Sequence, residues 1–455
     1  MIESNLTAFI PEYEELYKMF PFTNDKTVYV HGEVEGSLFK CKAKVENVEE
    51  SVAERLSYVD EIEKKRYLKR FTKLCLYRAL SRLYGVKLPW GALTGIRPVK
   101  FAKSFENFEK EFKEVFDVSE SKIQLVKEIL SVQKDLVVEQ KKVDLYVGIP
   151  FCPTKCSYCS FVSGAINKNT PVDEYIEALC YEISEQMQLF EGKIGTVYIG
   201  GGTPASLTTR QSEKMLKALN VKSGTEFTLE AGRPDCITDE KLKLYSDYGV
   251  NRICVNPQSF NQKTLDEIGR KHTAEDIEIA YNRARNYDFI INMDLIAGLP
   301  KESFEDFKYS FDKTLSLSPE NITVHTLCLK AGSVLKQACQ RLGGDEIGKM
   351  LDYSHSVLTQ NGFSPYYLYR QKYMAGNYEN VGYSLKGKEC LYNVGVMEEV
   401  TSNPAFGANA NSKIVFDGGK KILRYYPPRD VKTYIEKIKD ISKEKIKFFE
   451  KKFAI

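Results

Sequence analysis

The stretch YVGIPFCPTKCSYCSF, residues 146–161, brings three cysteines close together: Cys152, Cys156 and Cys159. An apolar run at residues 145–149 precedes them, so the cysteines leave a predicted strand. Thiolates bind zinc or iron–sulfur clusters. A closed zinc site takes four ligands, usually from two Cys-x2-Cys pairs, and the sequence has no second pair and only four dispersed histidines. Three cysteines on one short loop favour a [4Fe–4S] cluster with one open iron, with structural zinc as the alternative.

Short apolar runs recur after this loop, with mostly helical stretches between them. Including the first, they occupy residues 145–149, 197–199, 227–229, 252–255, 290–296 and 322–327. Near-continuous apolar strands that alternate with helices predict an α/β fold whose parallel strands are buried on both faces. Six such units in roughly 200 residues predict a partial, TIM-like (β/α)6 barrel rather than the full eightfold one. A doubly wound open sheet is the alternative.

Residues with chemical potential follow these strands at their carboxyl ends, where barrel active sites lie. They are the cysteines, the glycine run Gly200, Gly201 and Gly202, then Glu230, Gln258 and Asp294. Glycines let a backbone approach a ligand closely. A charged side chain at the end of an apolar strand costs desolvation unless it is paired or exposed in a cleft. Each carboxylate alone is compatible with a structural role, whereas several at one rim favour a site.

Three regions are expected along the chain. Residues 1–140 form an α+β domain, since residues 27–45 alternate as a small antiparallel sheet does and helical stretches follow. Residues 141–342 form the partial barrel, and residues 343–455 form a shorter C-terminal region. Its lysine-rich tail places Tyr434, Ile438 and Ile441 on one helical face, which predicts an amphipathic packing helix rather than a membrane helix.

The composition restricts the function classes. The 455 residues carry a net charge of +3, which argues against a nucleic-acid partner. No apolar stretch is long enough for stable membrane insertion, and the acidic N-terminus does not resemble a signal peptide. A cytoplasmic location is therefore expected. The eleven cysteines are an odd number without an export signal, so a disulfide framework is not expected.

The cysteine spacing resembles that of the radical S-adenosylmethionine (SAM) enzymes. In that family the amino and carboxylate groups of SAM chelate the open iron, and one electron from the cluster releases a 5′-deoxyadenosyl radical. The resemblance implies a [4Fe–4S] cluster and SAM as cofactors. It also implies that the glycine run binds the amino group of SAM.

A longer series of motifs resembles the branch of oxygen-independent coproporphyrinogen III dehydrogenases, over about residues 144–412. The series comprises YVGIPFCPTKCSYC, IGGGTP, the Glu230 strand, Gln258-Ser259-Phe260, Gly269-Arg270-Lys271-His272, MDLIAGLP at residues 293–300 and FGANANS at residues 406–412. The loop LTGIRPVK at residues 93–100 and the run at residues 367–383 resemble the long-form subgroup.

By this resemblance, Cys152, Cys156 and Cys159 bind the cluster. Tyr146, Gly201 and Glu230 would contact the SAM on the open iron. A possible second SAM would be held by Tyr158, Gly202, Thr203, Gln258, Arg270 and Asp294. No side chain is predicted to be catalytic, because the radical arises at the bound SAM.

The implied reaction converts two propionates of coproporphyrinogen III to vinyl groups and yields protoporphyrinogen IX. A tetrapyrrole substrate with four carboxylates calls for cationic and aromatic groups, and Tyr369, Arg370 and Lys372 are the candidates. An ordinary tyrosine-rich strand is the alternative interpretation of this segment. Reduced flavodoxin or ferredoxin is the electron donor that the family implies.

Some features leave the substrate open. Gly148 stands where the branch usually has a histidine, and the chain after residue 412 is short for a C-terminal helical domain. Two relatives therefore compete with the dehydrogenase: a haem-binding chaperone that carries the same cysteine loop, and a radical methyltransferase that opens haem. The role of residues 1–140 and the oligomeric state are not predicted.

Overall fold

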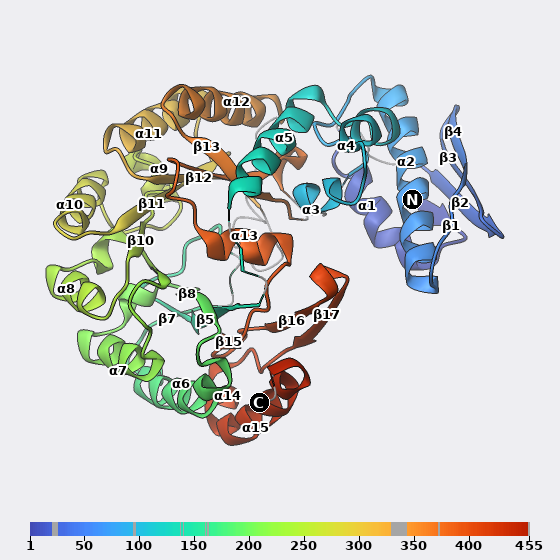
Figure 1. Cartoon of the computed structure of the whole chain (residues 1–455). Helices are drawn as coiled ribbons and strands as arrows, with labels where there is room; N and C mark the ends of the chain where they lie inside the picture. The colour runs from blue at the N-terminus through green and yellow to red at the C-terminus, as the bar shows by residue number, and fades with distance from the viewer. Residues whose placement is uncertain are drawn as a thin grey trace. The chain divides into compact units, whose positions relative to one another are not determined.

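The computed structural model describes residues 1–20, 26–93, 97–136, 138–139, 141–159, 161, 163–328, 344–371 and 374–453 (Figure 1). The chain divides into two compact units. The N-terminal unit comprises Met1–Lys127 and Arg370–Glu379, and the main unit comprises Glu128–Tyr369 and Asn380–Ile455. The segment Arg370–Glu379 thus belongs to the N-terminal unit although both of its flanks belong to the main unit.

A nine-stranded sheet forms the framework of the main unit. In spatial order its strands are β13 (Ser364–Tyr369), β14 (Asn380–Ser384), β12 (Asn321–Thr326), β11 (Ile290–Ala297), β10 (Arg252–Val255), β9 (Glu226–Gly232), β8 (Ile194–Gly201), β5 (Val143–Ile149) and β15 (Ala405–Phe406). All neighbours from β12 to β15 are parallel, whereas β14 runs antiparallel to β12 and β13. The six predicted strands are found as six adjacent parallel strands, which confirms the predicted α/β arrangement.

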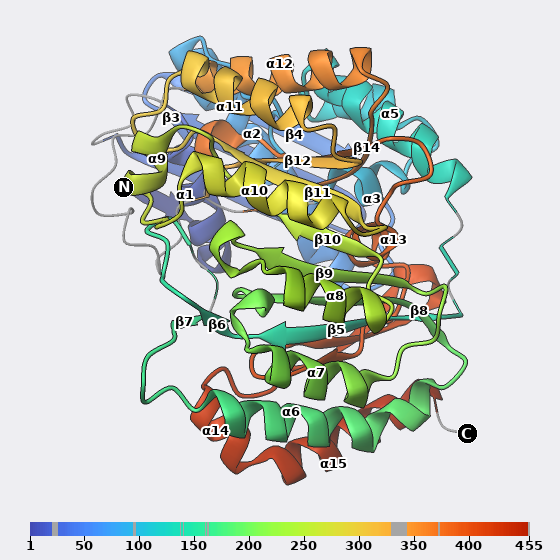
Figure 2. The same cartoon turned by 90° about the vertical axis from the view of Figure 1, so that its left-hand side faces the viewer.

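Helices cover one face of this sheet, as Figures 1 and 2 show. They are α6 (Val172–Gln186), α7 (Thr209–Leu219), α8 (Asp239–Asp247), α9 (Gln262–Glu267), α10 (Ala274–Arg285), α11 (Phe304–Ser316) and α12 (Gly344–Gln360). Thr208, Thr273 and Ser303 begin α7, α10 and α11 with capping boxes, which satisfy backbone N–H groups at the helix starts. A large apolar core lies between these helices and side chains such as Leu145, Val197 and Ile253.

The other face of the sheet carries polar and aromatic side chains, although most of the strand residues are buried on both faces. Alternate residues of β12 are Asn321, Thr323 and His325, and they share this face with Asn292 and Asp294 of β11. Since side chains alternate between the faces of a strand, the apolar residues between them point toward the helices. The inner face therefore offers polar contacts along β11 and β12, while α13 (Leu391–Glu398) packs against its aromatic side chains.

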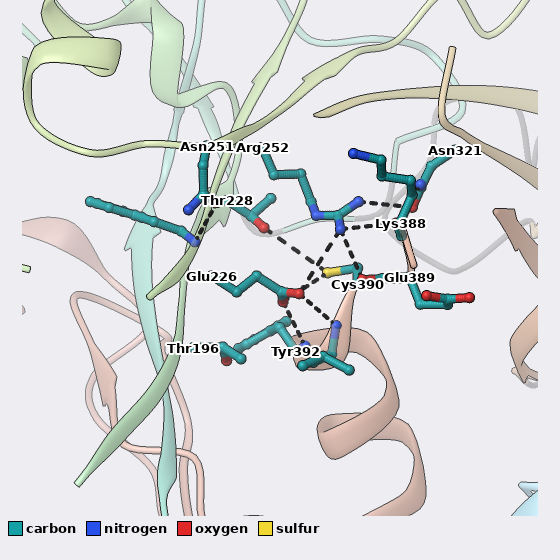
Figure 3. Close-up of polar contacts among 12 residues, drawn as sticks. Thr196, Glu226, Thr228, Asn251, Arg252, Asn321, Lys388, Glu389, Cys390 and Tyr392 are labelled. Atoms are coloured by element: carbon teal, nitrogen blue, oxygen red, sulfur yellow. Dashed lines mark hydrogen bonds and ion pairs between the residues drawn. The ribbon is translucent and has the colours of Figure 1, made fainter. Parts of the chain in front are cut away.

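Helix α13 (Leu391–Glu398) lies at the amino ends of the strands, where polar residues hold it (Figure 3). Glu226, the first residue of β9, accepts hydrogen bonds of 2.9 Å from the backbone N–H groups of Leu391 and Tyr392. Arg252, the first residue of β10, donates to the carbonyl oxygens of Lys388 and Glu389 at 2.9 and 2.8 Å. A carboxylate at a helix N-terminus is stabilising, so this cluster fixes α13 to the sheet.

The C-terminal helices α14 (Val431–Glu436) and α15 (Ile438–Phe453) pack against α6, after the hairpin of β16 (Ser412–Phe416) and β17 (Lys421–Tyr425). Tyr434 and Ile441 are buried, in agreement with the predicted packing helix. Lys445 is also fully buried and donates to Glu182 Oε1 of α6 at 2.5 Å. The tail is thereby attached through a buried ion pair as well as through apolar contacts.

The N-terminal unit contains the predicted antiparallel sheet. Its strands are β1 (Ile2–Ser4), β2 (Val28–Glu35), β3 (Leu38–Val45) and β4 (Val48–Arg55), and its helices are α1 (Ile10–Tyr17), α2 (Glu61–Tyr84), α3 (Pro98–Ala102), α4 (Phe108–Lys110) and the first part of α5 (Glu120–Asp135). β1 is parallel to β2, and the other pairs are antiparallel. In the described residues of both units, no helix is long and apolar enough to cross a bilayer.

Candidate active site

The cysteine loop is attached to the ends of two other strands. β6 (Phe151–Cys152) follows β5 and pairs with β7 (Gly164–Ala165). The Thr203 N–H, just after β8, donates to Phe151 O at 2.7 Å, and the Thr203 hydroxyl lies 3.6 Å from Cys152 Sγ. These contacts place the first cysteine beside the glycine run, as the chain order of the motifs predicts.

A buried arginine holds the middle of the loop. Arg233 follows β9 and donates to the hydroxyl of Thr154, between the first two cysteines. Asp235 binds the same guanidinium at 2.9 and 2.7 Å, which fixes its orientation. The sequence analysis missed Arg233, although it stands only three residues after Glu230 in the chain.

Cys152, Cys156 and Cys159 are unpaired thiols and only partly buried. Half-buried thiols on one loop have the donor chemistry that an iron–sulfur cluster requires. In the described residues, no three His, Cys, Asp or Glu side chains converge as they would around a single metal ion. A four-iron cluster is larger than one ion and holds its thiolates farther apart.

The glycine run brings the backbone of β8 against the cysteine loop. Gly201 has φ +115°, a conformation that favours glycine, and a Cβ there would lie 2.9 Å from Ile149 O. A Cβ on Gly202 would lie 2.3 Å from Phe151 O and 2.9 Å from Cys152 Sγ. Only glycine therefore fits where the run passes the first cluster cysteine.

Glu230 is directed toward this region from β9. Tyr198 of β8 donates its hydroxyl hydrogen bond to Glu230 Oε1. Burial raises the pKa of Glu230 to about 7, and the nearby negative charge of Asp294 acts in the same direction. The Tyr198 hydrogen bond opposes this rise because it stabilises the carboxylate. The carboxylate can therefore change its protonation state near neutral pH.

Asp294 of β11 is held in a polar network on the same inner face. Asn292 donates to Asp294 Oδ1 at 2.7 Å, and His325 Nε2 lies 3.6 Å from Asp294 Oδ2. Tyr369 at the end of β13 lies 3.2 Å from the other ring nitrogen of His325. Burial alone would raise the pKa of Asp294, but His325 and the hydrogen bonds from its neighbours keep it below the usual value.

Gln258 and Arg270 come next to these groups. Gln258 has a positive φ of 65°, and its backbone N–H donates to Asp294 O at 2.9 Å. Arg270 donates to Asn256 O at 2.6 Å and to the Tyr158 hydroxyl at 3.4 Å. Gln258 Oε1, Asn256 Oδ1 and Arg270 Nε are buried without a hydrogen-bond partner in the described part of the chain. Buried polar atoms normally have partners, so these three point to a ligand.

The nine residues predicted to bind cofactor all lie in the main unit. Seven lie on or just after β5, β8, β9, β10 and β11, whereas Tyr158 lies in the cysteine loop and Arg270 follows α9. The thiols, the glycine passage and the unpartnered polar atoms fit a cluster and SAM chemically. Of the three substrate candidates, Tyr369 lies on the inner face beside His325, whereas Lys372 falls outside the described residues.

Arg370 lies buried in the N-terminal unit. It donates to Leu93 O and Asn377 O and stacks on Trp90, with its guanidinium carbon 5.0 Å from the ring centroid. Burial lowers the pKa of Arg370 to about 9. Its charge is engaged within that unit, so a contact between Arg370 and substrate stays a prediction without geometric support.

Tyr198, His325 and Asn256 were missed by the sequence analysis. Each occupies the inner face of a strand or follows one directly. The signal was present in the alternation of polar and apolar residues, most clearly in NITVHT of β12. Treating these strands as uniformly apolar concealed it.

Comparison with known proteins agrees with this geometry. Residues 146–313 match the model of the Radical SAM superfamily. The chain is 38% identical to the oxygen-independent coproporphyrinogen-III oxidase-like protein HemZ of Bacillus subtilis, over 94% of this chain and 89% of that protein. It is 34% identical to the heme chaperone HemW of Lactococcus lactis, over 56% of this chain and 65% of that protein.

Among solved structures, coproporphyrinogen III oxidase (HemN) from Escherichia coli, described as a radical SAM enzyme, aligns with a TM-score of 0.55 at 22% identity. The alignment covers 69% of this chain and 72% of that one, and it supports the fold. The extent and identity of the HemZ match define the family. The chain belongs to the radical SAM superfamily, within the family of oxygen-independent coproporphyrinogen-III oxidase-like proteins that includes HemZ.

Proposed function

We propose that the protein oxidatively decarboxylates two propionates of coproporphyrinogen III to vinyl groups and so forms protoporphyrinogen IX. The observation that carries the proposal is the convergence of the three thiols, the glycine passage at Gly202 and the carboxylates Glu230 and Asp294 on one side of the sheet. The name of the HemZ relative supports the same reaction class.

Radical SAM proteins use a [4Fe–4S] cluster and SAM, which supply a radical that abstracts a hydrogen atom. In this chain, Cys152, Cys156 and Cys159 would hold the cluster. Gly202 leaves room beside Cys152, while Glu230 and Asp294 offer hydrogen-bond acceptors to hydroxyl or ammonium groups. These residues bind and orient the cofactors, since the hard chemistry belongs to the cofactors themselves.

Arg270 and Gln258 would complete the binding of a second SAM. Arg270 retains one unpartnered donor, Nε, and Gln258 retains an unpartnered acceptor, Oε1. An arginine donor suits a carboxylate group, and a carbonyl oxygen suits a hydroxyl or amino group. Arg270 Nε and Gln258 Oε1 would thus bind a ligand that carries both a carboxylate and a hydroxyl or amino group, as SAM does.

Each decarboxylation removes one hydrogen atom from the propionate β-carbon, one molecule of CO2 and one further electron. We propose an electron acceptor for this last electron, and reduced flavodoxin or ferredoxin as the donor to the cluster. The tyrosines of the inner face, including Tyr369, would pack against the macrocycle and exclude water.

A haem chaperone is the second candidate, because the chain is also similar to proteins named heme chaperone HemW. A chaperone would bind haem without consuming coproporphyrinogen III. The thiol loop alone does not separate the two functions, so the test must follow products.

The test is an anaerobic assay of protein reconstituted with iron and sulfide, supplied with SAM, dithionite and coproporphyrinogen III. We expect mass spectrometry to detect the loss of two carboxyl groups, with one 5′-deoxyadenosine for each loss. Cluster-loaded protein that forms no deoxyadenosine but binds haem stably would refute the dehydrogenase and favour the chaperone. A Cys156→Ser variant serves as the control that cannot hold the complete cluster.

A further inference from the structure

Three tyrosine rings form a stacked column on the inner face of the main unit. Tyr146 of β5 and Tyr198 of β8 are register partners, with ring centroids 6.4 Å apart and planes inclined by 20°. Tyr198 also stacks on Tyr392 of α13, at 4.5 Å and again 20°. The Tyr198 ring therefore packs against two other rings.

The lower end of this column is fixed by the cluster in Figure 3. Glu226 accepts hydrogen bonds from the backbone N–H groups of Leu391 and Tyr392, and Arg252 binds the carbonyls just before α13. Asn321 also donates to Lys388 O at 2.6 Å. Tyr392 is thus tied through its own backbone to the start of β9, the strand that carries Glu230.

The middle ring of the column, Tyr198, reaches the candidate cofactor site. The Tyr198 hydroxyl donates to Glu230 Oε1. A Cβ on Gly200 would lie 2.8 Å from Glu230 Oε2 and 2.9 Å from Tyr198 Cε1, so glycine allows the two side chains to meet. Because the Tyr198 ring packs against two other rings, its hydroxyl donates to the Glu230 carboxylate from one fixed direction.

We propose that Tyr198 is a positioning residue, which aims the Glu230 carboxylate at bound SAM and favours its ionised form. The proposal rests on the SAM site of the proposed function and adds a residue to it. Groups of both charges face Glu230: Tyr146, Tyr198, Cys254, Asp294, His325 and Tyr369. Of these, Tyr198 donates a hydrogen bond to the carboxylate.

Loss of the hydroxyl would make the Glu230 carboxylate harder to ionise. Burial already raises the pKa of Glu230 to about 7, and the Tyr198 hydrogen bond works against that rise. Without it the carboxylate would be protonated over a wider range and would lose its preferred direction. Its acceptor function would then return only at higher pH.

The test measures the affinity of cluster-loaded protein for S-adenosylhomocysteine by anaerobic calorimetry between pH 6 and 8.5. For Tyr198→Phe we expect roughly tenfold weaker binding at pH 7, the effect of one hydrogen bond to a charged group, and partial recovery at pH 8.5. Tyr392→Phe is the matched control, since it keeps its ring in the column and does not touch Glu230, and its affinity should equal that of the wild type.

A double-mutant cycle with Glu230→Gln shows whether Tyr198 acts through Glu230. We expect Tyr198→Phe to change the affinity of the Glu230→Gln protein less than twofold. An equal loss in both backgrounds, or wild-type affinity of Tyr198→Phe at all pH values, overturns the proposal. If the wild type does not bind S-adenosylhomocysteine, or Glu230→Gln binds it normally, the cofactor site itself is wrong.

Cluster content is measured for each variant before binding. If Tyr198→Phe does not hold a full cluster, 4-aminophenylalanine incorporated at position 198 replaces it, because its amino group stands where the hydroxyl does and keeps an N–H donor. We expect that variant to bind within about threefold of the wild type, as a retained donor predicts. A tenfold loss with a full cluster would show that a donor at this position is not sufficient and would refute the positioning role.

Discussion

Replacing Gly202 by alanine should impair cluster loading while leaving the fold of the main unit in place. The added Cβ would lie 2.3 Å from Phe151 O, inside the 3.0 Å that real Cβ atoms essentially never breach. Since the obstacle is a backbone carbonyl, no rotamer change can relieve the contact, and β6 must move. Phe151 O also accepts the Thr203 N–H at 2.7 Å, so that hydrogen bond is strained with it.

The expected cost is about 2–4 kcal/mol, from overpacking together with one weakened hydrogen bond. This cost falls on β6, the strand that carries Cys152. Since 1.4 kcal/mol already corresponds to about a tenfold change in an equilibrium constant, we expect Gly202→Ala to retain less than about half of the wild-type iron and sulfide after anaerobic reconstitution. Circular dichroism of the unloaded protein should show unchanged secondary structure.

Gly164→Ala is the matched control for this experiment. Gly164 belongs to β7, which pairs with β6, and a Cβ there meets no atom within 4 Å. We expect Gly164→Ala to load its cluster like the wild type. If Gly202→Ala loads as much iron as Gly164→Ala does, the close passage of the glycine run against Cys152 does not constrain the cluster site.

Three further predictions concern buried charges, and each is measured by the unfolding of the purified protein. Burial raises the pKa of Asp144 from 3.8 to about 6, so ionising Asp144 lowers the free energy of unfolding by about 3 kcal/mol above pH 6 and by nothing well below pH 4. Asp144→Asn should remove this loss of stability between pH 4 and 6. An unchanged pH profile in urea unfolding would contradict this expectation. Lys445→Met removes the ion-pair partner of Glu182, which keeps hydrogen bonds from Tyr434 and the Gly407 N–H, and should cost about 3 kcal/mol. The Glu182→Gln/Lys445→Met double variant should lose clearly less, and equal melting temperatures of the two variants would count against the ion pair. Glu379→Gln removes the charge that Lys122 and Trp90 each contact at 2.6 Å. Fluorescence of Trp90, the single tryptophan, should therefore report unfolding of the N-terminal unit at a lower urea concentration. An unshifted fluorescence transition would exclude a stabilising role of the Glu379 charge.

The sequence was sufficient to predict the six parallel strands, and their carboxyl ends stay the predicted location of the active site. Apolar runs locate β5, β8, β9, β10, β11 and β12, because each strand must supply one apolar face to the helix layer. Since these strands are parallel, residues that follow them gather at one edge, and this places Gly202, Glu230 and Asp294 in the same unit as the cysteines. The topology therefore follows from local pattern and chain order.

The local sequence pattern did not predict where Arg370 lies. The chain around it reads as a tyrosine-rich strand, and β13 does end at Tyr369. The next residue already belongs to the N-terminal unit, where Arg370 packs on Trp90, 280 positions away in the chain. A pairing between such distant segments leaves no periodic signal, so an arginine beside a site and an arginine inside another core look alike in the sequence.

Glu226 and Glu230 show how a carboxylate engaged within the fold differs from one that is proposed to bind a cofactor. Both lie on β9, four residues apart and on the same face of the strand, and both are close to a buried tyrosine. Glu226 stands at the amino end, where its two oxygens accept backbone N–H groups of α13 and Arg252 lies 3.9 Å away. Its bonding capacity is spent within the fold.

At the carboxyl ends of the strands, by contrast, some buried polar atoms have no hydrogen-bond partner among the residues that the structure describes. Gln258 Oε1 and Asn256 Oδ1 are buried and lack partners within the described ranges, and the pKa of Glu230 is raised although Tyr198 donates to it. A fold tolerates such groups when a ligand supplies what they lack, because an unpaired buried polar atom costs about 1–3 kcal/mol. The unpartnered atoms near Glu230 therefore support the candidate site together with its position at the strand ends, and they depend on neighbours that only the folded chain brings together.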